Sequence, residues 1–247
     1  MPIKYENAPI IEALIDIRVE LPLDTTLERL EGLHIQLREQ YPIKNKHAHV
    51  VGQFSVGDEV EASATRTQTG FVFSSEDGAF RVQARLDGFT FSSLRRPYGT
   101  WSELRDEARR LWEIYRSVAG PSKITRVAVR YVNQICIPEL VFDYKDYFRT
   151  TPEVSPDLPQ GLSGFFMQLI FPQEDFGGVL ILTQAAVPPV TPNTNSVILD
   201  LDVYKQGEIS ENETWDLLET LRMRKNRFFE GSLTEKARAL FGQRKEY

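Results

Sequence analysis

Two aspartates and two arginines in the second half of the chain have the types and spacing of a binding or catalytic site. Asp200 and Asp202 alternate with apolar residues over 199–203, so on a strand both carboxylates point to one face. Arg126 and Arg130 share one face of another predicted strand. The two carboxylates could hold a divalent cation, act as an acid–base pair, or form ion pairs with these arginines if the strands are neighbours. We favour the ion pairs, with a binding site as the next interpretation.

A second set of basic residues could bind nucleic acid. Its members are Arg95 and Arg96, before a predicted helix, and Arg105, Arg109 and Arg116, along one face of that helix. Phe89 and Phe91 could add stacking platforms for unpaired bases. Against this, Glu113 has helical spacing to two of the arginines, which is typical of a solvated, salt-bridged helix. The pI near 5.3 is also far below that of most nucleic-acid-binding domains.

Other reactive side chains lack the partners that chemistry requires. His47 and His49 would share a strand face, but no cysteine or nearby carboxylate completes a metal site. Cys136, the single cysteine, has no catalytic motif around it, and a core or sheet-face thiol is the simpler interpretation. The chain contains no phosphate-binding loop, dinucleotide fingerprint or nucleophile elbow. We therefore predict no catalytic residue, no metal ligand and no cofactor.

Hydrophobic periodicity predicts the elements that position these residues. In the first half it predicts a strand at 11–21, a helix within 25–41, strands at 49–56, 61–74, 80–86 and 89–94, and a helix at 101–119. In the second half it predicts a strand at 124–137, a short helix at 143–148, strands at 165–171, 179–186 and 196–204, and a helix at 212–230. Thr100 and Glu103 have capping-box spacing at the start of the first long helix. Ser232 and Glu235 have the same spacing before a short last helix.

Two pairs of landmarks suggest that the chain repeats itself. The strands 11–21 and 124–137 end at Pro22 and Pro138, which are 116 residues apart. Trp101 and Trp215, near the starts of the two long helices, are 114 residues apart. We therefore predict an α+β fold of two similar lobes, 1–121 and 122–247, produced by internal duplication. Each lobe would be a mainly antiparallel sheet with helices on one face, and the two would join closely as one globular unit.

Composition favours a soluble cytoplasmic protein. One cysteine, no secretory apolar region and no apolar run of about 20 residues predict a cytoplasmic chain without a membrane span. Segment 81–130 has a net charge of +6, whereas 131–221 has −11. Such asymmetry can indicate a protein or nucleic-acid partner, but we favour the interpretation that the blocks lie close together in the folded molecule and cancel.

Four segments together resemble a sporadically distributed family of uncharacterised prokaryotic proteins. They are N-A-P-I-I-E-A (7–13), R-Y-V-N-Q-I-C-I-P (130–138), L-D-L-D-V-Y (199–204) and K-N-R-F-F-E-G-S-L-T-E (225–235). The resemblance spans the whole chain and implies no known activity and no catalytic residue. A patchy distribution implies a mobile or defence-associated gene context.

These observations lead to one main functional hypothesis and two alternatives. We expect a non-enzymatic binding or adaptor protein that acts with a protein partner. The first alternative is a nucleic-acid-binding protein that uses the basic 81–130 region. The second is a metal-dependent enzyme centred on Asp200 and Asp202. Unpaired sheet edges would also permit a homo-oligomer.

Overall fold

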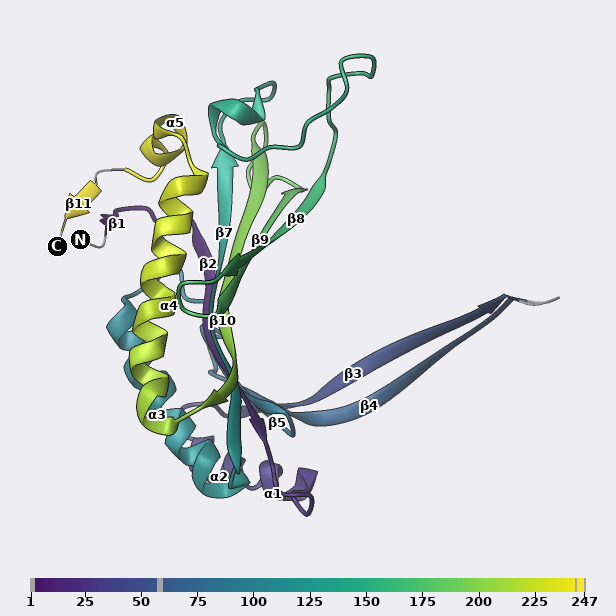
Figure 1. The fold of residues 1–247 in the computed structure, drawn as a ribbon, viewed down its shortest axis with the longest axis vertical. Helices are drawn as coiled ribbons and strands as arrows, with labels where there is room; N and C mark the ends of the chain where they lie inside the picture. The colour runs from purple at the N-terminus through teal and green to yellow at the C-terminus, as the bar shows by residue number, and fades with distance from the viewer. Residues whose placement is uncertain (1–2, 57–59, 243, 247) are drawn as a thin grey trace.

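One large antiparallel sheet organises the molecule (Figure 1). The computed structural model describes residues 3–56, 60–242 and 244–246, and within them nine strands form this sheet. In spatial order they are β3 (Ile43–Val56), β4 (Val60–Ser74), β5 (Phe80–Arg85), β6 (Gly88–Ser93), β2 (Ile10–Glu20), β7 (Lys123–Ile137), β10 (Asn195–Ile209), β9 (Gly178–Val187) and β8 (Phe166–Gln173). The predicted mixture of helices with a mainly antiparallel sheet is confirmed.

The helices cover one face of the sheet and leave the other open (Figure 1). They are α1 (Leu27–Glu31), α2 (Leu33–Leu37), α3 (Trp101–Ala119), α4 (Glu211–Ser232) and α5 (Glu235–Ala239), with a 3₁₀ turn at Tyr144–Asp146. Helix α3 packs on β2 and β6, and α4 packs on β7 and β10. The short strands β1 (Ile3–Tyr5) and β11 (Arg244–Glu246) pair with each other beside the sheet. We call the face away from α3 and α4 the open face.

The hydrophobic core lies between the sheet and these helices. On β2, Ala13, Ile15 and Ile17 are fully buried toward the helices, whereas Leu14 and Asp16 between them point to the other face. Trp112 and Tyr115 of α3 are likewise buried, and both rings contact Phe89 of β6. Every second residue of each central strand is therefore committed to the core, and the residues between them form the open face.

The two long helices pack against each other as antiparallel neighbours through reciprocal contacts. Arg109 of α3 lies over the ring of Trp215 of α4, and Arg222 of α4 lies over the ring of Trp101 of α3. The Trp101 indole also donates a 2.7 Å hydrogen bond to Glu219. Each helix contributes one tryptophan and one arginine to these contacts, which join the helices over the two halves of the sheet.

The two predicted halves share this single sheet. Their first strands, β2 and β7, lie next to each other at its centre, where Ile15 pairs with Val129. On either side of this pair lies the strand that precedes a long helix, β6 before α3 and β10 before α4. The halves are thus continuous in one sheet, and the structure does not separate them into two lobes.

Several predicted elements differ from those in the structure. The helix expected within 25–41 is two short helices that meet at Gly32, and Ile35 of the predicted apolar stripe is 73% exposed. The helix expected at 143–148 is the 3₁₀ turn, and Ser232 lies inside α4 while Thr234 caps α5. Strand β3 begins directly after Pro42, earlier than its apolar pattern indicated, because pairing with β4 extends it.

Strands β3 and β4 continue beyond the sheet as a two-stranded ribbon. Strand β4 pairs with β5 only from Gly70 to Ser74, whereas β3 and β4 pair with each other as far as Val56 and Val60. Figure 1 shows this ribbon extending away from the side of the sheet that carries the helices.

Candidate functional site

A layer of ion pairs crosses the centre of the open face. Its members are Arg85 on β5, Asp16 on β2, Arg126 and Arg130 on β7, and Asp200 and Asp202 on β10. We call this set the ion-pair layer. All six positions point away from the helices because they alternate with the buried core residues of the same strands.

Asp16 is the centre of this layer. Its Oδ1 accepts hydrogen bonds from Arg18 at 3.2 Å and Arg126 at 2.9 Å, and its Oδ2 accepts from Arg85 at 2.9 Å and Thr90 at 2.7 Å. Burial raises the pKa of this carboxyl, but Arg85 and Arg18 together with the Thr90 hydroxyl outweigh burial and hold the pKa below its usual value. Asp16 is therefore a charged structural centre rather than an acid that exchanges a proton near neutral pH.

Arg126 links Asp16 to Asp202 across two strands. Its guanidinium lies 4.2 Å from the centre of the Tyr204 ring and donates a 2.8 Å hydrogen bond to Asp202 Oδ2. The other oxygen, Asp202 Oδ1, is buried and has no hydrogen-bond partner among the described residues. Burial raises the pKa of Asp202, although Arg126 and Arg130 oppose this effect.

Arg130 binds Asp200 with two nitrogens. Its Nε lies 2.9 Å from Oδ1, and its Nη2 lies 2.5 Å from Oδ2. The ion pairs that we expected between Arg126, Arg130 and the two aspartates are thus present, because β7 and β10 are neighbours. Within the described part of the chain, no group of three His, Cys, Asp or Glu residues is placed to hold a metal ion.

The ion-pair layer borders a shallow hollow of about 690 Å³ on the open face. Arg18, Arg85, Arg126 and Arg130 contribute positive charge to its lining, and Asp16, Asp87 and Asp202 contribute negative charge. Each of these arginines donates to at least one carboxylate, so their charges are largely neutralised inside the protein. Such a surface attracts a polyanion weakly, because affinity for phosphates depends on unpaired cations.

The arginines along α3 are also occupied. Arg105 donates to Glu219 of α4 at 2.6 Å and to Asp106 at 2.9 Å, and Arg109 lies over Trp215. The interpretation of Phe89 and Phe91 as stacking platforms was wrong, because both are fully buried in the core.

Pairing between segments accounts for the uneven charge along the chain. Residues of the basic segment 81–130 bind acidic residues of 131–221 in the pairs Arg105–Glu219, Arg116–Glu211, Lys123–Glu208, Arg126–Asp202 and Arg130–Asp200. The two blocks therefore cancel largely within the folded molecule.

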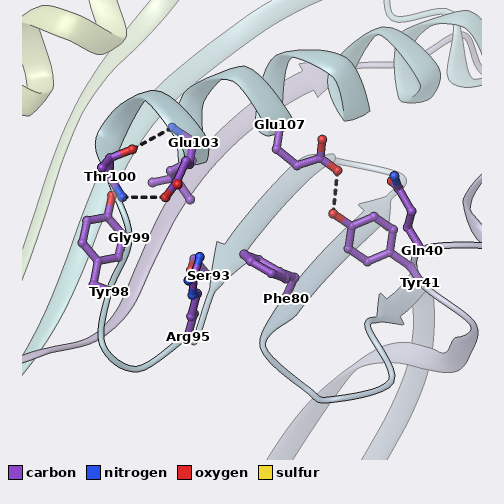
Figure 2. A pocket seen from close by; sticks show the side chains of 11 residues that line it. Gln40, Tyr41, Phe80, Ser93, Arg95, Tyr98, Gly99, Thr100, Glu103 and Glu107 are labelled. Atoms are coloured by element: carbon purple, nitrogen blue, oxygen red, sulfur yellow. Dashed lines mark hydrogen bonds between the residues drawn. The ribbon is translucent and has the colours of Figure 1, made fainter.

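Arg95 and Arg96 differ from the other candidate arginines. Both are exposed, and neither makes a hydrogen bond or ion pair with any residue that the structure describes. Arg95 lines a second hollow, of about 430 Å³, beside the start of α3 (Figure 2). Arg96 does not line it. The structure thus divides the predicted binding residues between the open face, the contact of α3 with α4, and this hollow, and places Arg96 in none of the three.

The remaining reactive side chains have ordinary surroundings. His47 Nδ1 lies 2.9 Å from the Thr69 hydroxyl, and its ring contacts His49. The Cys136 thiol is exposed on the open face and lies 3.8 Å from the Ser196 hydroxyl.

Sequence reasoning predicted the strand at 165–171 but missed that this strand, β8, forms an exposed apolar edge of the sheet. It pairs with β9 on one side, and no strand of the described chain pairs with its other side. On the open face, Phe166 is 72% exposed and Ile170 is 61% exposed. The signal was present in the letters FMQLIFPQ, which contain no charged residue.

Comparison with known proteins adds no family to this description: no protein-family model matches the chain, and no curated protein matches it. The resemblance drawn from the four segments therefore stays a prediction; in the structure these segments lie on β2, β7, β10 and α4 and the turns beside them. Among the described residues, no helix is both long enough and apolar enough to cross a membrane.

Proposed function

We propose that the chain is a non-enzymatic binding or adaptor protein that holds a protein partner along the β8 edge of its sheet. The observation that carries this proposal is the eight-residue edge strand without a charged side chain. A sheet edge presents backbone N–H and C=O groups that can pair with another chain. Proteins usually protect such edges with charged residues or proline. Strand β8 has no charged residue and its one proline, Pro172, lies next to its last residue, so the edge from Phe166 to Phe171 is available for docking.

The partner that fits this edge is a protein segment in an extended conformation. Adding a strand to β8 satisfies its outer backbone groups, and alternating side chains of the added strand then lie on the two faces of the sheet. On the open face they would lie beside Phe166 and Ile170. The next strand continues this surface with Ile181 and Thr183, which are half-buried. An apolar residue at every second position of the partner would bury this strip.

The same geometry supports the two alternatives less well. Four of the candidate arginines already bind carboxylates or an aromatic ring, which leaves Arg95 and Arg96 for nucleic acid. Arg130 binds both oxygens of Asp200 and Arg126 binds one oxygen of Asp202, so a cation would have to displace guanidinium groups from every oxygen of the pair except Asp202 Oδ1. A protein partner requires no such rearrangement.

We also infer that the two halves of the chain arose by duplication, and that the open face combines equivalent strands of both. The strand order supports this. In each half the first long strand lies at the centre of the sheet, and the later strands follow outward in reverse chain order, as β2-β6-β5-β4 and as β7-β10-β9-β8. The reciprocal contacts of Trp101 and Trp215 support it too. In this scheme β8 corresponds to β4, and only β4 has a further strand, β3, on its outer side.

The test is native mass spectrometry of the tagged protein purified gently from its own host. We expect a mass above an integer multiple of 28.4 kDa, with the excess contributed by a protein. The double change Phe166→Lys and Ile170→Lys should remove that excess, because two charges would face the added strand. Both side chains are exposed, so the fold should retain its stability.

Ile35→Lys provides the matched control. Ile35 is as exposed as Phe166 but lies on α2, away from the β8 edge, so this variant should retain the partner. Retention of the partner by the β8 variant would refute the proposed edge. A mass equal to two copies, lost in the β8 variant alone, would identify a second copy of this chain as the occupant in place of another protein.

A further inference from the structure

The hollow beside the start of α3 is built from parts of the chain that lie far apart in the sequence. Figure 2 shows Arg95 and Phe80 on the sheet side of this hollow, facing Glu103 and Glu107 on α3, with Tyr41 at one end. Its volume of about 430 Å³ lies within the range of small-molecule sites. It is separate from the β8 edge, so an inference about it does not depend on the proposed function.

Arg95 brings an uncompensated positive charge to this hollow. No described carboxylate lies within ion-pair distance of its guanidinium, in contrast to the arginines of the ion-pair layer. A guanidinium has five N–H donors in a planar fork that matches a carboxylate. The hollow therefore offers a ready partner for one carboxylate of a ligand.

Glu103 brings a negative charge close to Arg95. Its Oε2 accepts a 2.8 Å hydrogen bond from the Thr100 backbone N–H, while its Oε1 has no partner among the described residues. Gly99 shows how near the two charges are: a Cβ on that residue would lie 2.1 Å from Glu103 Oε2 and 3.7 Å from Arg95 Nη1. Both charged groups therefore border one glycine without forming an ion pair with each other.

The rest of the lining is uncharged or already neutralised. Phe80 and Leu104 line the hollow together with the ring of Tyr41. Glu107 also lines it, but its two oxygens accept from the Tyr41 hydroxyl at 2.7 Å and from Arg110 at 2.6 and 2.8 Å. It adds no free charge, so the site consists of one cation and one anion beside an apolar wall.

We propose that this hollow binds a free α-amino acid with a large apolar side chain. The ligand carboxylate binds Arg95, its ammonium group binds Glu103 Oε1, and its side chain packs against Phe80 and Leu104. An α-amino acid carries its two charges a few ångströms apart, which matches the adjacent guanidinium and carboxylate. A simple anion of the same size would meet Glu103, and a simple cation would meet Arg95, so each would be attracted by one group and repelled by the other.

Isothermal titration calorimetry with L-phenylalanine, L-leucine and L-methionine tests the site. The full chain is titrated with each amino acid, with N-acetyl-L-phenylalanine, which lacks the ammonium charge, and with L-phenylalanine amide, which lacks the carboxylate. We expect at least one free amino acid to bind with a Kd below about 1 mM. Both derivatives should bind at least about tenfold more weakly.

Arg95→Ala and Arg96→Ala form a matched pair of variants. The two arginines are adjacent and exposed, but only Arg95 lines the hollow. Arg95→Ala should weaken binding about tenfold or more, whereas Arg96→Ala should leave it unchanged. Glu103→Gln should weaken binding of the free amino acid but strengthen binding of N-acetyl-L-phenylalanine, which then no longer meets a like charge; a general loss of structure would weaken the binding of both.

Three results would overturn the assignment. The first is no heat of binding from any of the three amino acids at concentrations of about 10 mM. The second is equal weakening by Arg95→Ala and Arg96→Ala. The third is undiminished binding of both derivatives, because a ligand that needs neither charge would not use Arg95 and Glu103.

Discussion

Asp16→Asn tests whether the centre of the ion-pair layer stabilises the fold. The Asp16 side chain is 9% exposed and its partner Arg85 is 3% exposed, so the change leaves a buried guanidinium without its main counter-charge. Removing one partner of a buried ion pair costs about 3–5 kcal/mol. Arg85 would keep Asp87, and Arg126 would keep Asp202. We therefore expect the lower end of that range, about 3 kcal/mol.

The same carboxyl should contribute to the acid sensitivity of the protein. Burial raises its pKa, but the neighbouring arginines and Thr90 hold it below the usual value. A carboxyl whose pKa is lower in the folded state stabilises that state above its unfolded pKa of about 3.9. This contribution is lost as the pH falls through the lower, folded pKa. The Asp16→Asn variant should lack this part of the acid transition.

Urea denaturation followed by circular dichroism measures both effects. Asp87→Asn is the matched control: Asp87 also binds Arg85, but its side chain is 49% exposed, so we expect a loss below about 1 kcal/mol. Asp16→Leu combined with Arg85→Met removes both buried charges and should recover much of the stability that either single change loses.

Two outcomes would refute this reasoning. If Asp16→Asn costs no more than Asp87→Asn, burial does not set the strength of the interaction. If the double variant loses the sum of the two single losses, the two groups are not coupled as an ion pair.

Two further predictions concern the packing of the sheet. Lys225 of α4 is 6% exposed, its Nζ lies 3.6 Å from the Tyr131 ring centre, and burial together with Arg222 lowers its pKa to about 7. Because a lysine in the unfolded chain has a pKa of about 10.4, folding stability should fall as the pH drops from about 10 to 7. Lys225→Met should remove this slope and raise the free energy of unfolding by about 2 kcal/mol near neutral pH, measured by urea denaturation across this pH range; an unchanged slope would contradict the assignment. Gly88 has a φ of +152°, and a Cβ there would lie 2.4 Å from the Ile17 carbonyl oxygen. Gly88→Ala should therefore cost about 2 kcal/mol or more in thermal denaturation, while Gly164→Ala, which meets nothing within 4 Å, should be nearly neutral; equal melting temperatures would exclude the steric explanation.

Periodicity and capping predicted the elements that have strong local signals. The alternation over 11–21 predicted β2, and Ala13, Ile15, Ile17 and Val19 do face the core. The Thr100–Glu103 capping box forms as expected at the start of α3. Both features depend on neighbours in the sequence, so one segment carries enough information to predict each of them.

The arrangement of strands could not be predicted in the same way. That Asp16 joins Arg126 depends on β2 lying beside β7, a contact between residues 110 positions apart. Likewise, Arg95 was singled out for nucleic acid because its sequence neighbours are basic, whereas its spatial neighbours are Phe80 and Glu103. The uncharged β8 became informative once its position at the sheet edge was known.

The central position of β2 beside β7 has a consequence for the way the protein is made. Ile15 leaves the ribosome 114 residues before its partner Val129. At about 5–20 residues per second, β2 waits on the order of ten seconds for that neighbour. During this interval the nascent first half has an open edge in the middle of the future sheet, which other unfinished chains could pair with. The second half of the chain thus completes the fold and also ends this period of exposure.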